Sequence, residues 1–296
     1  MTRTTRYLLL MFLAILVGMY FYTTCCSECG ASEIEEPPKK AVVHATPEPT
    51  SYLFAFSDGN YASNENNNYY INASSYAILI PLDTSTETGI RSLKSFLSEN
   101  TGKVMNITGY YKSDETNDSA FPNLGLACAN AVKNHLVSNG ISSASMNTMG
   151  KLMDDMVPDE EIYLGPIAYN ISGKSETVGQ ELKALCENFK VNPLVLYFDS
   201  ANASINLLTE QRQKVTDISR YLDKVEGTTV NIVGQIDNMV IAATNTKIGL
   251  NKANFGKAYF MRNGIPDAKI NTSSKGQIDP VESNTSEEGR TVVTLN

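Results

Sequence analysis

The chain has 296 residues, of which 42% are hydrophobic and 19% are charged, and its formal net charge is −8. This length accommodates two ordinary domains and an anchor, because domains commonly run to about 100–150 residues. The composition is that of a globular protein and excludes a disordered or collagen-like chain. The negative charge disfavours nonspecific binding to nucleic acid, which needs a basic surface, so we expect no nucleic-acid partner.

Residues 1–24 are predicted to be a transmembrane anchor. The apolar run 7–24 contains 18 residues, at the short end of the about 17–25 that span a bilayer. Arg3 and Arg6 precede this run and an acidic segment follows it, which places the body of the protein in the periplasm. A cleaved signal peptide is the alternative, although the bulky residues 20–22 do not form a small-x-small cleavage site.

Residues 25–50 are predicted to form a periplasmic tether that contains cysteines and prolines. The prolines favour an extended, semi-stiff chain. Cys26 and Cys29 have the CxxC spacing of redox and metal sites, but no second ligand pair accompanies them, and we expect no metal site or cofactor. In an oxidising compartment, Cys25, Cys26 and Cys29 are expected to form disulfides with one another or across a homodimer.

The rest of the chain contains an internal repeat. Residues 105–109 match residues 230–234, and both segments are predicted to be buried strands that enter a turn. A helical pattern follows each strand: residues 123–141 align without gaps on residues 247–265 and are identical at eight of nineteen positions. Both helices end in Asn-Gly, which is typical of a helix C-terminus.

Further elements complete the two copies. The predicted strands are 76–80, 144–148 and 161–171 in the first copy and 194–198, 268–273 and 291–295 in the second, and the predicted helices are 88–98, 176–189 and 207–225. Residues 57–75, rich in Asn and Tyr without a clear period, are predicted to be an insertion loop. The alternation predicts an α/β class (an α+β sandwich), in which each copy packs helices on one face of a mixed sheet.

The second copy resembles the OmpA C-terminal family. The family motif runs from Gly-x-Thr-Asp through Asn-x-x-Leu-Ser-x-x-Arg-Ala, Gly-Ile and Gly-x-x-x-Pro to a final Asn-Arg-Arg-Val. The corresponding segments here are 234–237, 245–253, 264–265, 276–280 and 289–293. The resemblance implies a degenerate OmpA-like domain over 51–172, a connecting helix over 173–193 and an OmpA-like domain over 194–296.

The resemblance also implies a ligand. In that family an Asp and an Arg fifteen residues apart hold the diaminopimelate of the peptidoglycan stem peptide, whose ammonium and carboxylate suit such a pair. Asp237 and Lys252 stand at these positions, and lysine keeps the charge but loses the bidentate fork, so we expect weaker or altered binding. Asn238, Asn245 and Arg290 complete the predicted peptidoglycan-binding residues. The alternative is a surface ion pair, worth about 0–1 kcal/mol, in a domain that has lost its ligand.

The first copy departs further from the family motif. Lys112 stands where the family has its Asp, with Asp114 two residues later, and Cys128 stands where the family has its Arg. We therefore predict a structural or partner-binding module in the first copy. Cys128 is expected to be a buried small residue. His135, on the same predicted helix, is expected to be an exposed or packed side chain.

The sequence contains no nucleophile elbow, phosphate loop or HExxH motif and has only two histidines, so we predict no catalysis. The acidic cluster around Pro158 is predicted to be a solvated loop. The predicted function is that of a noncatalytic cell-envelope protein that associates with peptidoglycan and links the wall to the membrane. The alternative is a scaffold in an envelope assembly, as in stator proteins, although residues 7–22 lack the ionisable residue that proton flow requires.

Overall fold

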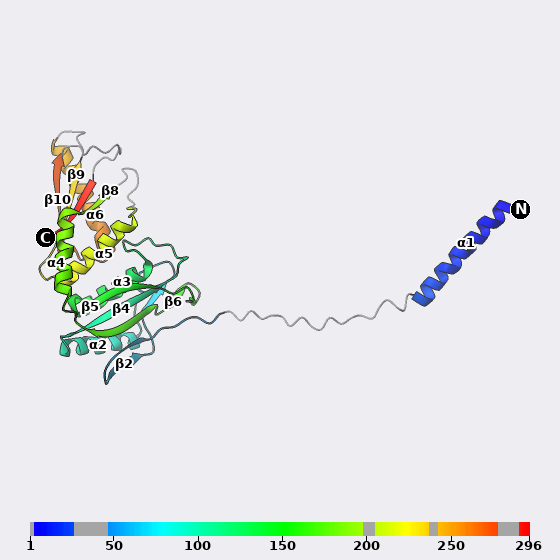
Figure 1. Cartoon of the computed structure of the whole chain (residues 1–296), viewed down its shortest axis with the longest axis horizontal. Helices are drawn as coiled ribbons and strands as arrows, with labels where there is room; N and C mark the ends of the chain where they lie inside the picture. The colour runs from blue at the N-terminus through cyan, green and yellow to red at the C-terminus, as the bar shows by residue number, and fades with distance from the viewer. Residues whose placement is uncertain (1–2, 27–46, 198–204, 237–241, 278–289) are drawn as a thin grey trace. The chain divides into compact units, whose positions relative to one another are not determined.

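The structure is a computed structural model in which two compact units are distinguished, Met1–Pro47 and Glu48–Asn296. It describes residues 3–26, 47–197, 205–236, 242–277 and 290–296. The first unit contains the apolar helix α1 (Arg3–Phe21), which a short π-helix (Tyr22–Cys26) continues (Figure 1). The segment Arg3–Thr24 is long and apolar enough to cross a membrane, a property that N-terminal signal sequences share.

The N-terminal lobe of the second unit comprises the elements from β1 to β7. Their bounds are β1 Phe54–Asp58, β2 Tyr61–Glu65, β3 Tyr70–Asn72, α2 Thr84–Glu99, β4 Lys103–Tyr111, α3 Leu124–Ser138, a 3-10 turn Ser143–Ser145, β5 Met146–Leu152, β6 Ile162–Leu164 and β7 Ile167–Gly173. The main sheet has the order β5-β4-β7, with β4 parallel to β5 and antiparallel to β7. Leu93 of α2 and Val132 of α3 are fully buried in one core with Ile107 of β4.

The C-terminal lobe comprises the elements from α4 to β11. Their bounds are α4 Val178–Val191, β8 Leu194–Tyr197, α5 Thr209–Lys224, β9 Val230–Ile236, α6 Ala242–Arg262, a 3-10 turn Asp267–Lys269, β10 Ile270–Gln277 and β11 Arg290–Leu295. The sheet has the order β10-β9-β11-β8, with β9 parallel to β10 and antiparallel to β11. β9 and β4 therefore have the same kind of strand pairing, because each lies between one parallel and one antiparallel neighbour.

Glycine pairs place one helix directly on the central strand of each lobe. A Cβ added to Gly109 would lie 1.9 Å from the carbonyl oxygen of Gly125 on α3, and a Cβ added to Gly234 would lie 1.8 Å from that of Gly249 on α6. Only glycine permits such an approach of two backbones. The two pairs occupy matching positions of the sequence repeat.

The predicted Asn-Gly helix ends are confirmed in both lobes. α3 ends at Ser138 and α6 at Arg262, immediately before these dipeptides. Gly140 and Gly264 adopt φ values of 85° and 87°, in the left-handed region that glycine favours. The amide of Asn139 and that of Asn263 close each last turn on carbonyl oxygens of their helices.

The predicted insertion loop over 57–75 is wrong, because this segment contains β2, β3 and the end of β1. Tyr69 and Ile71 are almost fully buried. Asn68 is buried as well: its amide donates to the carbonyl of Ile167 at 2.9 Å and its side-chain oxygen accepts from the Tyr169 hydroxyl at 2.9 Å. Polar residues are part of the core here because their hydrogen bonds are satisfied.

The predicted strand over 76–80 is also wrong. Only an isolated bridge joins Ile78 to Ile71, and Ile80 is 74% exposed. Pro81 follows and has no amide hydrogen with which to extend pairing. The side of β7 away from β4 is instead contacted by β1, whose Phe54 ring lies 4.3 Å from that of Tyr169.

The helix predicted as a mere connector contributes to the C-terminal core. α4 contacts α5 and β11, and Phe189 near its end is 3% exposed within that core. The loop that precedes α3 enters the same core through Phe121, which is 2% exposed. Residues of both lobes thus share one continuous apolar cluster.

Candidate functional site

One end of the C-terminal sheet gathers the strand ends that the family motif marks. Arg290 at the start of β11 pairs in register with Tyr197 at the end of β8 and with Gln235 near the end of β9. Gly276 near the end of β10 pairs with Gln235 from the other side. The residues that continue from these ends, 198–204, 237–241 and 278–289, lie outside the described residues. The termini of all four strands of this sheet therefore lie at the same end of it.

Helix α6 begins at this end of the sheet and supplies two of the predicted residues. Asn245 is fully buried, whereas Lys252 is half-buried. The close approach of Gly249 to Gly234 fixes the position of α6 against β9. Lys252 lies less than one turn after Gly249, so a long side chain with a positive charge is placed on the helix that borders the strand ends.

Arg290 lies on the face of the sheet away from α6. Side chains alternate along a strand, so Gly234, which contacts α6, and Gln235 point to opposite faces. Arg290 is the cross-strand neighbour of Gln235, and its Nε donates to the Gln235 side-chain oxygen at 2.9 Å. Gln235 is 7% exposed and was not expected from the sequence, since only the strand register pairs it with Arg290.

The remaining candidates are not placed. Asp237 and Asn238 lie outside the described residues, and so does Cys29. The backbones of Cys25 and Cys26 belong to the π-helix after α1, but their side chains are not among the described ones. The predicted Asp237–Lys252 pair and the predicted disulfide therefore stay predictions.

The N-terminal lobe fills the equivalent region with its own residues. Cys128, which aligns with Lys252, is 3% exposed, as expected, and its Sγ lies 3.6 Å from the carbonyl oxygen of Ser75. Burial, with a further contribution from Glu115, raises the pKa of the Cys128 thiol to about 12. This thiol is therefore uncharged and unreactive at neutral pH.

Glu115 closes the loop that follows β4. Its carboxylate accepts hydrogen bonds from the backbone amides of Lys112, at 2.7 Å, and Ser74, at 3.2 Å. The ammonium of Lys112 lies 3.8 Å from the carboxylate of Asp114. Lys112 and Asp114, the two charged residues near the family's Asp position, thus lie close to each other. The Glu115 carboxylate of the same loop accepts hydrogen bonds from backbone amides.

His135 packs in the N-terminal lobe, as expected. Its Nδ1 lies 3.0 Å from the Tyr69 hydroxyl, and burial lowers its pKa. In the acidic cluster, Asp154 accepts from the amide of Ser113 at 2.7 Å, and this hydrogen bond lowers the pKa of the Asp154 carboxyl. Within the described ranges, no group of three or more His, Cys, Asp or Glu residues could hold a metal ion.

Comparison with known proteins identifies the C-terminal lobe. Residues 197–293 match the model of the OmpA family. Over 94 residues the chain is 30% identical to outer membrane protein A of Bordetella avium. The aligned segment covers 32% of this chain and 47% of that protein. The chain thus spans about half the length of this curated relative.

Solved structures with a similar segment include the peptidoglycan-associated lipoprotein from Burkholderia pseudomallei, at 19% identity and a TM-score of 0.29, over 34% of this chain and 89% of that chain. Another is the C-terminal domain of Helicobacter pylori MotB, at 18% identity and a TM-score of 0.27, over 36% of this chain and 84% of that chain. By the family match, residues 197–293 of this chain are an OmpA family domain.

Proposed function

We propose that the C-terminal lobe attaches this protein to peptidoglycan through the diaminopimelate of the stem peptide, and that the N-terminal helix holds it to a membrane. The observation that carries the proposal is the match of residues 197–293 to the OmpA family. The convergence of strand ends at Tyr197, Gln235 and Arg290 supports it, since segments of the family motif adjoin these positions in the sequence. The role is noncatalytic, with the body in the periplasm.

The proposed contacts follow from charge. The Asp237 carboxylate binds the ammonium of diaminopimelate, and the Lys252 ammonium binds its carboxylate as a point charge. Asn245 is fully buried in the first half of α6, so we assign it a structural role in the lobe in place of direct contact with the ligand. Arg290, bonded to Gln235 on the other face of the sheet, fixes β11 beside β9 at the same end.

The N-terminal lobe is proposed to be a degenerate OmpA-like copy with a structural role. Three features support this: the shared strand order, the matching glycine pairs and the two Asn-Gly helix ends. Cys128 and Glu115 occupy the region where a ligand pair would stand. The diaminopimelate contact is therefore assigned to the C-terminal lobe alone.

A scaffold without a wall ligand is the second candidate. Lys252 favours it, because an ammonium cannot make the bidentate contact of a guanidinium. In that case the body, exposed to the periplasm, serves as an interaction module for other envelope proteins. Both candidates leave the membrane attachment unchanged, so a ligand titration separates them.

The test is calorimetric titration of the full-length protein in detergent micelles with a stem tripeptide that ends in diaminopimelate. We expect Asp237→Ala to weaken binding at least tenfold, because it removes a charge-assisted bond. Lys252→Arg should strengthen binding, because it restores the bidentate fork. Asp267→Ala serves as the matched control, since Asp267 is a carboxylate of the same lobe that is 63% exposed.

The titration separates wall attachment from the scaffold role. Binding by the parent that is lost in Asp237→Ala and kept in Asp267→Ala supports wall attachment. A parent protein that is folded by circular dichroism, but that binds neither the tripeptide nor purified sacculi, excludes wall attachment and leaves the scaffold.

A further inference from the structure

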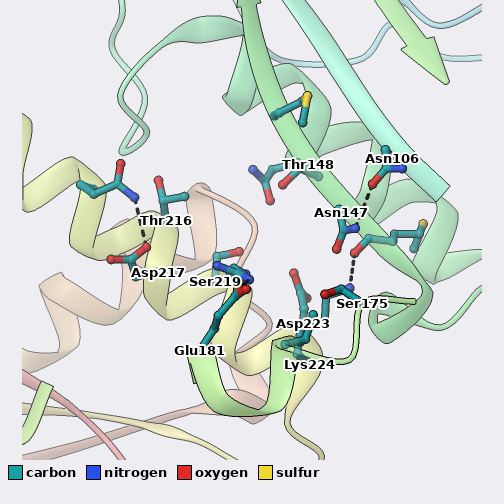
Figure 2. A pocket seen from close by; sticks show the side chains of 16 residues that line it. Asn106, Asn147, Thr148, Ser175, Glu181, Thr216, Asp217, Ser219, Asp223 and Lys224 are labelled. Carbon is teal, nitrogen blue, oxygen red and sulfur yellow. Dashed lines mark hydrogen bonds and ion pairs between the residues drawn. The ribbon is translucent and has the colours of Figure 1, made fainter. Parts of the chain in front are cut away.

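A cleft of about 430 Å³ lies where the sheet of the N-terminal lobe faces helices α4 and α5 (Figure 2). Asn106 of β4 and Asn147 of β5 line one wall, and Thr216 and Asp217 of α5 line the other. The cleft has the size of small-ligand sites, which commonly enclose about 300–1,000 Å³. It is built from elements outside the proposed diaminopimelate site.

The wall formed by the sheet is a row of amides. Met105 and Ile107 are fully buried in the core, so Asn106 between them points to the opposite, open face. Its Nδ2 donates to the Ser172 hydroxyl at 2.8 Å, and its Oδ1 accepts from the Asn147 amide at 2.9 Å. These hydrogen bonds fix the orientation of both amides before any ligand arrives.

The hydrogen-bond donors of the cations that line the cleft are already engaged. Arg220 is paired with Glu181. Asp223 is paired with Lys133 of α3. The ammonium of Lys224 donates to the carbonyl oxygens of Ala144, at 2.9 Å, and Met146, at 2.7 Å. A phosphate would therefore find Arg220 and Lys224 already engaged and would lie beside the carboxylates Glu181, Asp217 and Asp223, so the cleft suits a neutral, hydrogen-bonding ligand better than an anion.

Asp217 adds a directional acceptor to this neutral lining. Its carboxylate accepts from the Gln213 amide at 3.1 Å, and burial raises its pKa. Thr148 of β5 and Thr216 of α5 also line the cleft, and Met149, which is 51% exposed, supplies an apolar contact. Outside the ion pairs, the lining offers amides, hydroxyls, the Asp217 carboxylate and a thioether, a mixture that matches a ligand with hydroxyl and acetamido groups.

An aromatic surface continues along the same sheet face. Tyr110 lies four residues after Asn106 on β4, about 13 Å away in an extended strand, and points to the same side. The ring of Tyr52 lies 4.9 Å from that of Tyr110, and the ammonium of Lys151 lies 5.9 Å from the Tyr110 ring. Half-buried aromatic rings pack against the C–H faces of sugar rings, and the distance from Asn106 suits an oligomer.

We propose that this cleft and the adjoining Tyr110 surface bind the N-acetylated amino-sugar backbone of the peptidoglycan glycan strand. The inference rests on the proposed wall attachment and adds a second contact with the same polymer. The stem peptide would meet the strand ends of the C-terminal lobe, while the glycan would meet the cleft between α5 and the open sheet face of the N-terminal lobe. Two weak contacts on one polymer reinforce each other through effective concentration.

The test uses a linear tetramer of N-acetylglucosamine, which carries no peptide, titrated into the full-length protein in detergent micelles. We expect Asn147→Ala with Asp217→Ala to weaken binding at least tenfold, and Tyr110→Ala to weaken it severalfold. Met149→Trp should also block binding, because it adds a ring at an exposed position of the cleft without removing a core contact. Glu210→Ala, an exposed change on α5 outside the cleft, should bind like the parent.

Asp237→Ala separates the two proposals, because it should leave tetramer affinity unchanged whatever it does to the tripeptide. The glycan proposal is overturned if the parent does not bind the tetramer, if Met149→Trp binds it like the parent, or if a tetramer of glucose without acetamido groups binds equally well. Tripeptide binding with no tetramer binding would overturn this inference and leave the proposed function standing.

Discussion

Lys133 of α3 and Asp223 of α5 form an ion pair between the two lobes in which the lysine side chain is 3% exposed and the aspartate side chain 21%. The Lys133 ammonium also donates to the Asn130 side-chain oxygen at 2.9 Å and lies 3.4 Å from the Ser219 hydroxyl. The cation is therefore enclosed by oxygen atoms, whereas its anionic partner retains contact with water.

This asymmetry predicts unequal costs of mutation. Asp223→Ala should lower the free energy of unfolding by about 3–5 kcal/mol, because it leaves a buried cation without its counter-charge. Lys133→Met should cost less, because the partly exposed Asp223 can be hydrated and a thioether side chain fills the vacated volume. Urea denaturation of the full-length protein in micelles measures both. Equal losses, or a larger loss for Lys133→Met, would contradict the prediction.

Glu187→Ala provides the control for that comparison. Glu187 pairs with Lys190 on α4, and both side chains are well exposed, at 70% and 62%. Removal of an exposed pair should change the free energy of unfolding by no more than about 1 kcal/mol.

Lys224 predicts a rise in stability at alkaline pH. Burial, opposed by the Asp223 carboxylate and reinforced by Lys133, Arg220 and Lys174, lowers its pKa from 10.5 to about 8. Between these two pH values the unfolded chain binds more protons at this group than the folded chain, so its contribution to the free energy of unfolding increases as pH rises. Denaturation at pH 7.0, 8.0, 9.0 and 9.5 should show this increase in the parent and a smaller one in Lys224→Met.

The glycine contacts predict a sharp steric limit. Gly109→Ala should destabilise the protein by at least about 3 kcal/mol, because the new methyl group would overlap the carbonyl of Gly125 and neither backbone can move alone. Gly173→Ala, at the end of β7, has no atom within 4 Å of the added Cβ and should be nearly neutral. Thermal unfolding of the two variants measures the difference, and a Gly109→Ala protein as stable as Gly173→Ala would refute the close packing.

The proposed membrane attachment predicts a depth-dependent effect of charge. Leu13→Lys places an ammonium near the middle of Arg3–Thr24 and should make insertion less favourable by about 3 kcal/mol. We expect a larger fraction of this variant in the soluble fraction after carbonate extraction. Val191→Lys, at a position that is 83% exposed in the body, should fractionate like the parent. Complete release of the parent by carbonate would argue for a cleaved leader.

The parts of the fold that the sequence predicted are those set by local pattern. The repeated strands and helices around Gly109 and Gly234 follow from hydrophobic period, glycine and the Asn-Gly ends, which act within a few residues. The segment around Asn68 and Tyr69 was misjudged because its composition suggests a loop. Its burial depends on Tyr169, about a hundred residues away in the chain.

The residues of the candidate site divide in the same way, into those that sequence spacing predicts and those that depend on tertiary contacts. The motif positions of Asn245 and Lys252 could be read from spacing, and the structure places both on α6. The hydrogen bond between Gln235 and Arg290 could not be predicted from the sequence, because it depends on the register of β9 against β11. The cleft beside Asn147 and Asp217 was missed for a related reason: β4, β5, α4 and α5 must first pack before its polar groups face one another.

The way in which the two lobes interlock bears on how the protein would carry a pulling force. The backbone amide of Ala120 donates to the side-chain oxygen of Asn263 at 2.8 Å. The side-chain amide of Asn134 donates to the carbonyl oxygen of Gly264 at 3.0 Å. Together with Phe121 in the core of the C-terminal lobe, these bonds tie the N-terminal lobe to the end of α6. Tension between an anchored N-terminus and a ligand held by the C-terminal lobe would load this boundary along its whole contact area. The body would then resist extension as a single element.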